Sequence, residues 1–208
     1  MKRYQVADNN LRKISISAMD LLIEKKSETE SNAGSSLSSQ IALETEYTFN
    51  TEMLEFIRAI KNKYRIYVLT NLSAGEKDEP EKIAKEKQKV HEMLLKLCKQ
   101  DIIKGSHRLM YSASEVGHIA QIRHLAADLH IENDFQIVKS LLQHMNKFHL
   151  INGVRPGLRS APPDSKEDMD QFVRRQANKV LFFNDTASYS AKIKDAMSKN
   201  TSADKKNQ

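Results

Sequence analysis

The chain has 208 residues and a formal net charge of +6, which permits an acidic partner, an anionic membrane or nucleic acid and selects none of them. Its single cysteine, Cys98, excludes a disulfide within the chain and favours a reducing compartment. No stretch reaches the roughly 18 apolar residues that a membrane span needs, and residues 1–4 lead into polar sequence rather than a signal region, so the sequence predicts a soluble protein.

The first predicted elements are a strand, an insertion, a helix and a second strand. Residues 13–18 alternate apolar and polar side chains, which is typical of a β-strand. Residues 25–46 are rich in Ser and Glu and predict a flexible insertion. Asn50 or Thr51 is expected to cap the following helix, because a side-chain oxygen there can accept from free amides of the first turn. Residues 64–70 are β-branched and aromatic and predict a buried strand.

The middle of the chain continues this alternation. Residues 80–100 predict a long helix, and residues 107–112 predict a strand. Ser112 and Glu115 have the spacing of a capping box, which predicts a helix beginning between them. We expect its apolar face to run from Val116 through Ile119, Ile122 and Leu125.

The last predicted elements complete the sheet. Residues 129–131 predict a short strand, Asn133 or Asp134 is expected to cap the next helix, and residues 148–151 predict another strand. Strands that alternate with helices favour a parallel sheet covered on both faces. The fold class is therefore α/β, with a Rossmann-like parallel sheet of about five strands.

The domain organisation follows from these elements. We expect an N-terminal tail over residues 1–10, a Rossmann-like domain over residues 11–155 and a Pro-containing loop with a helical extension over residues 156–200. Residues 201–208 are expected to be disordered.

No motif for a cofactor, a metal or a catalytic nucleophile occurs in the sequence. It contains no GxGxxG, GxxxxGK[ST], HExxH, CxxC or GxSxG string. His118 and His124 are six apart on one helix and face different sides, and Cys98 sits among apolar residues as a small buried hydrophobe. Lysine and acidic residues interleave over residues 76–89, which is typical of a solvated helix face and not of a nucleic-acid surface. We therefore expect no catalytic, cofactor or metal residues.

Two short strings resemble motifs of haloacid-dehalogenase-type phosphatases. Residues 68–71 are similar to the motif in which a hydroxyl, here that of Thr70, holds a phosphate. Residues 180–185 are similar to the acidic motif that binds magnesium, here with Asp185. That superfamily needs a nucleophilic Asp after its first strand, and the strand predicted here ends without one. The alternative hypothesis is thus a degenerate dehalogenase-like domain, inactive or weakly active with magnesium.

The segment over residues 109–151 resembles a different family, the peroxisome assembly proteins called peroxin twenty-two, in their plant-type form. The family pattern is a strand, then Ser-Thr-Glu-Val/Ile-Gly, a helix with Val-Arg-Gln-Leu, and Asp-Trp-His-Ile-Asp. The matching positions here are Ser114, Glu115, Val116, Gly117, Arg123, Leu125, Asp128, His130 and Ile131. The Pro-containing residues 159–163 and residues 169–172 are similar to a later stretch of that family.

This resemblance implies a Rossmann-like domain without enzymatic activity. It implies an adaptor that binds, recruits and stimulates the peroxisomal ubiquitin-conjugating enzyme, of the peroxin-four type, and so supports ubiquitination and recycling of the import receptor. The implied location is the cytosolic face of the peroxisomal membrane, or the cytosol if the family's anchor is absent. The expected partner-binding residues are Ser114, Glu115, His118, Arg123 and His130. Arg123 and His130 are favoured because neither is needed for a helix cap or for the core.

Overall fold

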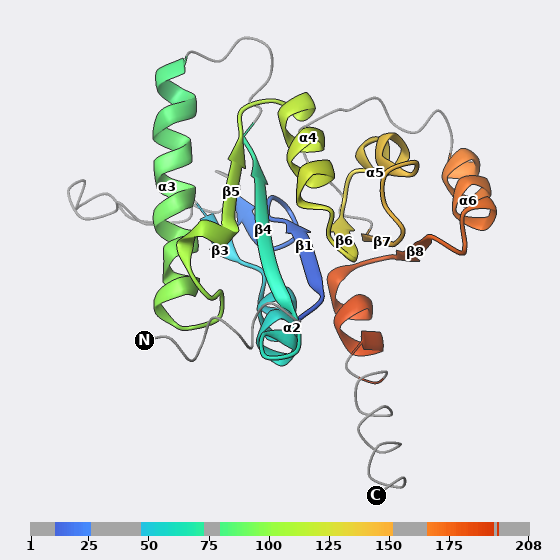
Figure 1. Cartoon of the computed structure of the whole chain (residues 1–208), viewed down its shortest axis with the longest axis horizontal. Coiled ribbons are helices and arrows are strands. Elements are labelled where there is room, and N and C mark those ends of the chain that lie inside the picture. The colour runs from blue at the N-terminus through green and yellow to red at the C-terminus, as the bar shows by residue number, and fades with distance from the viewer. Residues whose placement is uncertain (1–10, 26–46, 73–79, 152–165, 194, 196–208) are drawn as a thin grey trace, which may run out of the picture.

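The computed structural model describes residues 11–25, 47–72, 80–151, 166–193 and 195. The fold is a six-stranded parallel sheet in the order β5-β4-β1-β6-β7-β8 (Figure 1). The strands are β1 (Lys13–Ser17), β4 (Arg65–Asn71), β5 (Leu109–Ser112), β6 (Leu129–Glu132), β7 (Phe148–Ile151) and β8 (Val180–Phe183). The chain builds outward from β1 to β5 on one side and then from β6 to β8 on the other, which is the Rossmann order. The predicted α/β class is confirmed, with six strands in place of about five.

Helices cover both faces of the sheet (Figure 1). The helices are α2 (Thr51–Ile60), α3 (Pro80–Lys99), α4 (Glu115–Leu125), α5 (Phe135–Leu141) and α6 (Lys166–Arg175). Helices α2 and α3 and the helical residues 186–193 contribute to one apolar cluster. Helices α4, α5 and α6 contribute to the other, in which Phe135 and Phe172 meet edge to face at 4.8 Å between ring centroids.

Strand β1 is buried on both faces, although its sequence alternates apolar and polar side chains. Ile14 and Ile16 face the cluster formed with α2 and α3. Ser15 and Ser17 face the opposite side and are buried as well, with exposed fractions of 0 % and 5 %. A pattern that is usual for a half-solvated strand therefore belongs to the centre of the sheet, and the two hydroxyls must find partners inside the protein.

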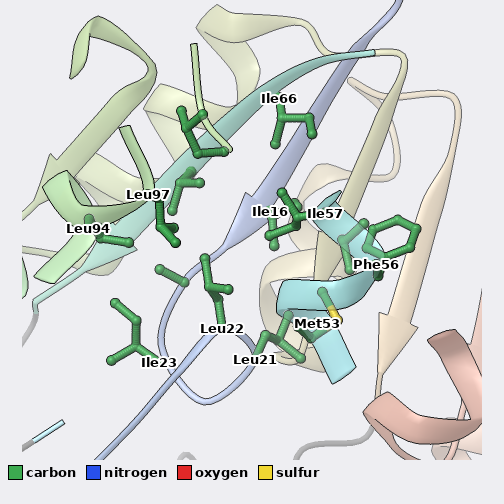
Figure 2. Close-up of a cluster of buried hydrophobic side chains, with 14 of the residues drawn as sticks. Ile16, Leu21, Leu22, Ile23, Met53, Phe56, Ile57, Ile66, Leu94 and Leu97 are labelled. Atoms are coloured by element: carbon green, nitrogen blue, oxygen red, sulfur yellow. The ribbon is translucent and has the colours of Figure 1, made fainter. Parts of the chain in front are cut away.

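The larger core lies against the isoleucine face of β1. Figure 2 shows Leu22, from the turn after β1, between Leu94 and Leu97 of α3 and Met53 of α2. All four of these side chains are at most 1 % exposed, as is Ile16 above them on the sheet. The turn after β1 therefore works as part of the core rather than as a ligand loop.

The segment after this turn differs from the prediction. Ile23–Lys25 forms strand β2, which pairs antiparallel with β3 (Tyr47–Phe49). Lys25, the first residue of the expected insertion, is therefore the last residue of β2, and residues 26–46 lie outside the described residues. The same is true of the predicted tails at 1–10 and 201–208, of residues 73–79 and of residues 156–165.

Two of the three expected helix starts are confirmed, and the third is displaced. The side chain of Asn50 accepts from Met53 N at 3.0 Å, and that of Asp134 accepts from Gln136 N at 2.8 Å. At α4 the cap is Ser114, which accepts from the Gly117 amide, whereas the predicted cap Ser112 lies inside β5. The capping-box prediction was wrong because Ser112 is the last residue of β5 and its hydroxyl donates to Thr70 O at 3.4 Å, which leaves the cap to Ser114.

The predicted domain boundary at residue 155 was also wrong. Strand β8 lies within the stretch expected to be a helical extension, and it pairs in parallel with β7 from Val180 to Phe183. A four-residue apolar run between two helical patterns cannot be distinguished from buried helix by periodicity alone. The α/β domain therefore includes its sixth strand.

We expect the stability of the whole domain to depend on β8. Val180 is 1 % exposed and its neighbour Leu181 is 47 % exposed, so the two form a matched pair on one strand. Val180→Ala should lower the free energy of unfolding by about 2 kcal/mol, because it removes buried methyl groups. Leu181→Ala should change it by no more than about 0.5 kcal/mol. Urea unfolding followed by circular dichroism measures both, and equal small effects would mean that β8 is not part of the cooperative unit.

Candidate functional site

The first place to look for a site is the junction of β1 and β6, where the strand order reverses. Rossmann-like sheets bind ligands there, at the carboxyl ends of the strands. Five polar side chains meet at this junction and form what we call the switch-point network. They are Ser15 and Ser17 of β1, His130 and Glu132 of β6 and His118 of α4, and none is more than 5 % exposed.

Glu132 is the centre of the switch-point network. Its Oε2 accepts a hydrogen bond from Ser17 Oγ at 2.6 Å and lies 3.2 Å from His130 Nε2. Its Oε1 accepts from the backbone amides of Asn133 and Asp134 at 2.8 and 3.1 Å. Both carboxylate oxygens are therefore satisfied by the protein itself, as burial of a charge requires.

The donor balance fixes the roles of the two histidines. His130 Nε2–H donates to Glu132, so its Nδ1 accepts from Ser15 Oγ, 2.9 Å away. The Ser17 proton goes to Glu132, so Ser17 Oγ accepts from His118 Nε2–H at 3.2 Å. His118 Nδ1 has no hydrogen-bond partner. The network joins the two central strands to α4 through a continuous set of hydrogen bonds.

Electrostatics keep Glu132 ionised. Burial acts to raise the pKa of this carboxyl, but its polar contacts with the His118 and His130 rings outweigh burial and hold the pKa well below its usual range. A carboxyl that stays ionised at all moderate pH values is a poor general acid or base. Its role in this arrangement is to organise the donors around it.

The order Ser15–His130–Glu132 is that of a hydrolase triad, with the serine and the acid on opposite ring nitrogens of the histidine. Ser15 and His130 are both 0 % exposed, and Ser15 lies at the middle of the central strand. A nucleophile needs an approach for its substrate, and here the sheet and its helices occupy that space. We therefore interpret the network as structural.

The structure separates the predicted partner-binding residues into two groups. Ser114, Glu115 and Arg123 are exposed on α4 and remain candidates for contact with a partner. His118 and His130 are 1 % and 0 % exposed, so their prediction as contact residues was wrong: both rings point into the domain and belong to the switch-point network.

Sequence reasoning also missed Val116. It was expected on the apolar face of this helix, at helical spacing from Ile119 and Ile122, yet it is 78 % exposed. The helix is rotated about its axis so that His118, and not Val116, faces inward together with Ile122. The exposure of Val116 could be predicted from sequence only if it were known that His118, two residues later on the same helix, faces inward.

The geometry does not support the dehalogenase-like alternative. Thr70 is on β4 and Asp185 follows β8, and β1, β6 and β7 lie between them. Four strand spacings separate the two residues by roughly 19 Å. Asp185 instead accepts from Ser188 N at 2.6 Å, at the start of the helical residues 186–193. A phosphate held at Thr70 and a magnesium ion held at Asp185 would be too far apart to act on one substrate, so the strand order does not favour this alternative.

The described residues offer no other group suited to catalysis or metal binding. Within them, no three His, Cys, Asp or Glu side chains are arranged to share a metal ion. Cys98 is partly buried against the larger core, and burial raises the pKa of its thiol, which disfavours the reactive thiolate. In the part of the chain that the structure describes, no helix is both long and apolar enough to cross a bilayer.

Comparison with known proteins leaves the family open. No family model matches the chain, and no curated protein matches it.

We expect Glu132→Gln to destabilise the domain in a pH-dependent way. At pH 7 the loss should be about 3 kcal/mol, because the buried histidines lose their charged partner. The pKa of Glu132 in the folded protein lies below its ordinary value of 4.5, so the stability that its ionisation contributes is fully present above pH 4.5 and is lost progressively as the pH falls from 4.5 toward the lower folded pKa. The difference in free energy of unfolding between wild type and Glu132→Gln should thus be about 1 kcal/mol smaller at pH 4 than at pH 7.

Urea unfolding at pH 7, 5 and 4 measures this gap. Glu52→Gln, at an exposed position in the first turn of α2, is the matched control and should show no comparable loss. A gap that stays constant from pH 7 to pH 4 would contradict an ionised Glu132.

Proposed function

We propose that this chain is a non-catalytic adaptor that binds and stimulates a ubiquitin-conjugating enzyme of the peroxisomal, peroxin-four type. In that role it supports ubiquitination and recycling of the peroxisomal import receptor at the cytosolic face of the membrane. The identity of the partner rests on the resemblance of residues 109–151 to the peroxin-twenty-two family. The binding role is supported by the outer face of α4.

The observation that carries the proposal is a mixed stripe on α4 that faces solvent. Val116, Ala120 and Arg123 are spaced i, i+4 and i+7 and are all exposed, so they lie along one side of the helix. Val116 supplies an apolar anchor at 78 % exposure, and Arg123 supplies a side chain of the type enriched in binding hot spots. Ser114, the cap of α4, and Glu115, its first residue, are also exposed at this end of the helix.

The inner side of the same helix favours binding over chemistry. His118 fixes α4 to Ser17 and lies 3.6 Å from Glu132, so the crevice at the strand ends is filled by side chains. A helix held in this way presents its outer face in a fixed geometry, which lowers the entropy cost of association.

An adaptor of this kind needs no catalytic residue. A protein that binds the reactive conformation of an enzyme more tightly than its other conformations shifts the population toward the reactive one. Stimulation then depends on differential affinity alone, and a surface such as the α4 stripe can supply it.

We expect Val116→Asp and Arg123→Glu each to weaken capture of the peroxisomal conjugating enzyme by at least about tenfold, since each removes a potential anchor. Lys139→Glu, on the exposed side of α5, is the control and should leave capture unchanged. The measurement is a pull-down from a panel of purified ubiquitin-conjugating enzymes, followed by a ubiquitin-discharge assay on any enzyme recovered.

Two results would count against the proposal in different ways. If the folded chain captures none of the panel, the assignment of the partner is lost. If capture and discharge survive both substitutions on α4, the adaptor role stands and the interface lies elsewhere.

A further inference from the structure

A cavity of about 230 Å³ lies at the amino ends of β1, β6 and β7, whereas the switch-point network lies toward the carboxyl ends of the strands. Its walls also come from α2 and from the helical residues 186–193, which Figure 1 shows below the sheet. The two helices are in contact, because the rings of Phe56 and Tyr189 meet at 5.0 Å between centroids.

The floor of this cavity is apolar and firmly held. Ile14, Phe56, Ile60 and Tyr189 line it and are at most 4 % exposed. The Tyr189 hydroxyl donates to His149 Nδ1 at 3.0 Å. Burial, with a contribution from Lys147 and Lys192, lowers the pKa of His149 to about 4, so its ring is neutral at physiological pH and can accept that proton. The floor therefore carries no charge.

The rim of the cavity is positive. Arg12 and Lys147 line it with exposed side chains that make no hydrogen bond or ion pair to a described residue. The other lysine on the rim, Lys13, donates its ammonium to Leu125 O at 3.2 Å. The one acidic lining residue, Asp128, accepts from the Lys13 amide at 2.7 Å. Two cations thus remain available above an uncharged floor.

The size of the cavity limits what can enter it. Sites for cofactors and drug-sized ligands usually enclose about 300–1,000 Å³, and this cavity is smaller. A single side chain of a partner fits its volume better than a nucleotide or another cofactor does. Leu129 and Ile193 are only partly buried in its wall and offer the apolar contact that such a side chain needs.

We propose that this cavity receives an acidic segment of a partner protein, which inserts one apolar side chain against Leu129 and Ile193 and places carboxylates against Arg12 and Lys147. The complementary charge at the rim selects the segment, and the apolar floor anchors it. This site lies at the other end of the sheet from the start of α4, so it is independent of the function proposed above and would serve a second contact.

The test is a selection of a random heptapeptide phage library against the folded full-length chain. Enriched peptides should carry an aliphatic or aromatic residue flanked by Asp or Glu. Synthetic copies with a fluorescent label then give affinities by anisotropy. The double variant Arg12→Glu/Lys147→Glu should bind at least about tenfold more weakly than wild type, because attraction at the rim becomes repulsion. Alanine in place of the peptide's apolar residue should weaken binding to a similar degree.

A matched control keeps net charge from explaining the result. Lys104→Glu/Lys139→Glu makes the same change of charge at two exposed lysines away from the cavity and should bind like wild type. Enriched peptides without acidic residues, equal binding by both double variants, or no enrichment at all would overturn the proposal. It would also be overturned if sedimentation shows a dimer that only Arg12→Glu/Lys147→Glu dissociates, because the cavity would then hold a second copy of the chain.

Discussion

The centre of this fold depends on the burial of one ionised carboxylate, that of Glu132. Removing such a group from water costs several kcal/mol, which is recovered only if the surrounding donors are complete and well placed. Here the donors come from β1, from α4, from β6 itself and from the backbone that leads into α5. A slip of one residue in the β1–β6 register would turn Ser15 and Ser17 to the other face and leave the carboxylate with fewer partners. The carboxylate therefore specifies register as well as contributing stability.

Because of this buried carboxylate, the two faces of β1 are held by different interactions. On one face, Ile14 and Ile16 bury apolar area against α2 and α3, an interaction that is strong but not directional. On the other face, hydrogen bonds of fixed geometry position α4 through His118. Because α4 is held from the inside by a polar contact, its outer side can carry an exposed Val116 without the helix rolling to bury it. The surface proposed for partner binding is thus a consequence of the polar interior.

Much of the fold could be predicted from sequence, because the strand and helix periods and the caps at Asn50 and Asp134 are local signals. The switch-point network could not, because its hydrogen bonds join β1 to residues more than 100 positions away in the chain. Nothing near Ser15 or Ser17 distinguishes a hydroxyl that faces water from one that faces a buried histidine. For the same reason, sequence analysis placed Val116 on the apolar face of α4 and predicted His130 as a partner-contact residue. Strand β8 was missed because its only evidence is the pairing with β7.

The basic residues at the amino ends of the strands fall into two groups, which differ in whether they bind the carboxyl end of a helix. The carboxyl ends of helices carry partial negative charge and attract cations, and two lysines in this region serve that purpose: Lys13 binds the last carbonyl of α4 and Lys179 binds Leu142 O just after α5. Arg12 and Lys147 are not used in this way, although they line the cavity together with Lys13. Like charges held near one another repel, and no hydrogen bond within the described residues offsets that cost for these two. A carboxylate of a partner would offset this repulsion. We therefore assign a second interaction to the cavity at the amino ends of the strands, and not to the filled crevice at their carboxyl ends.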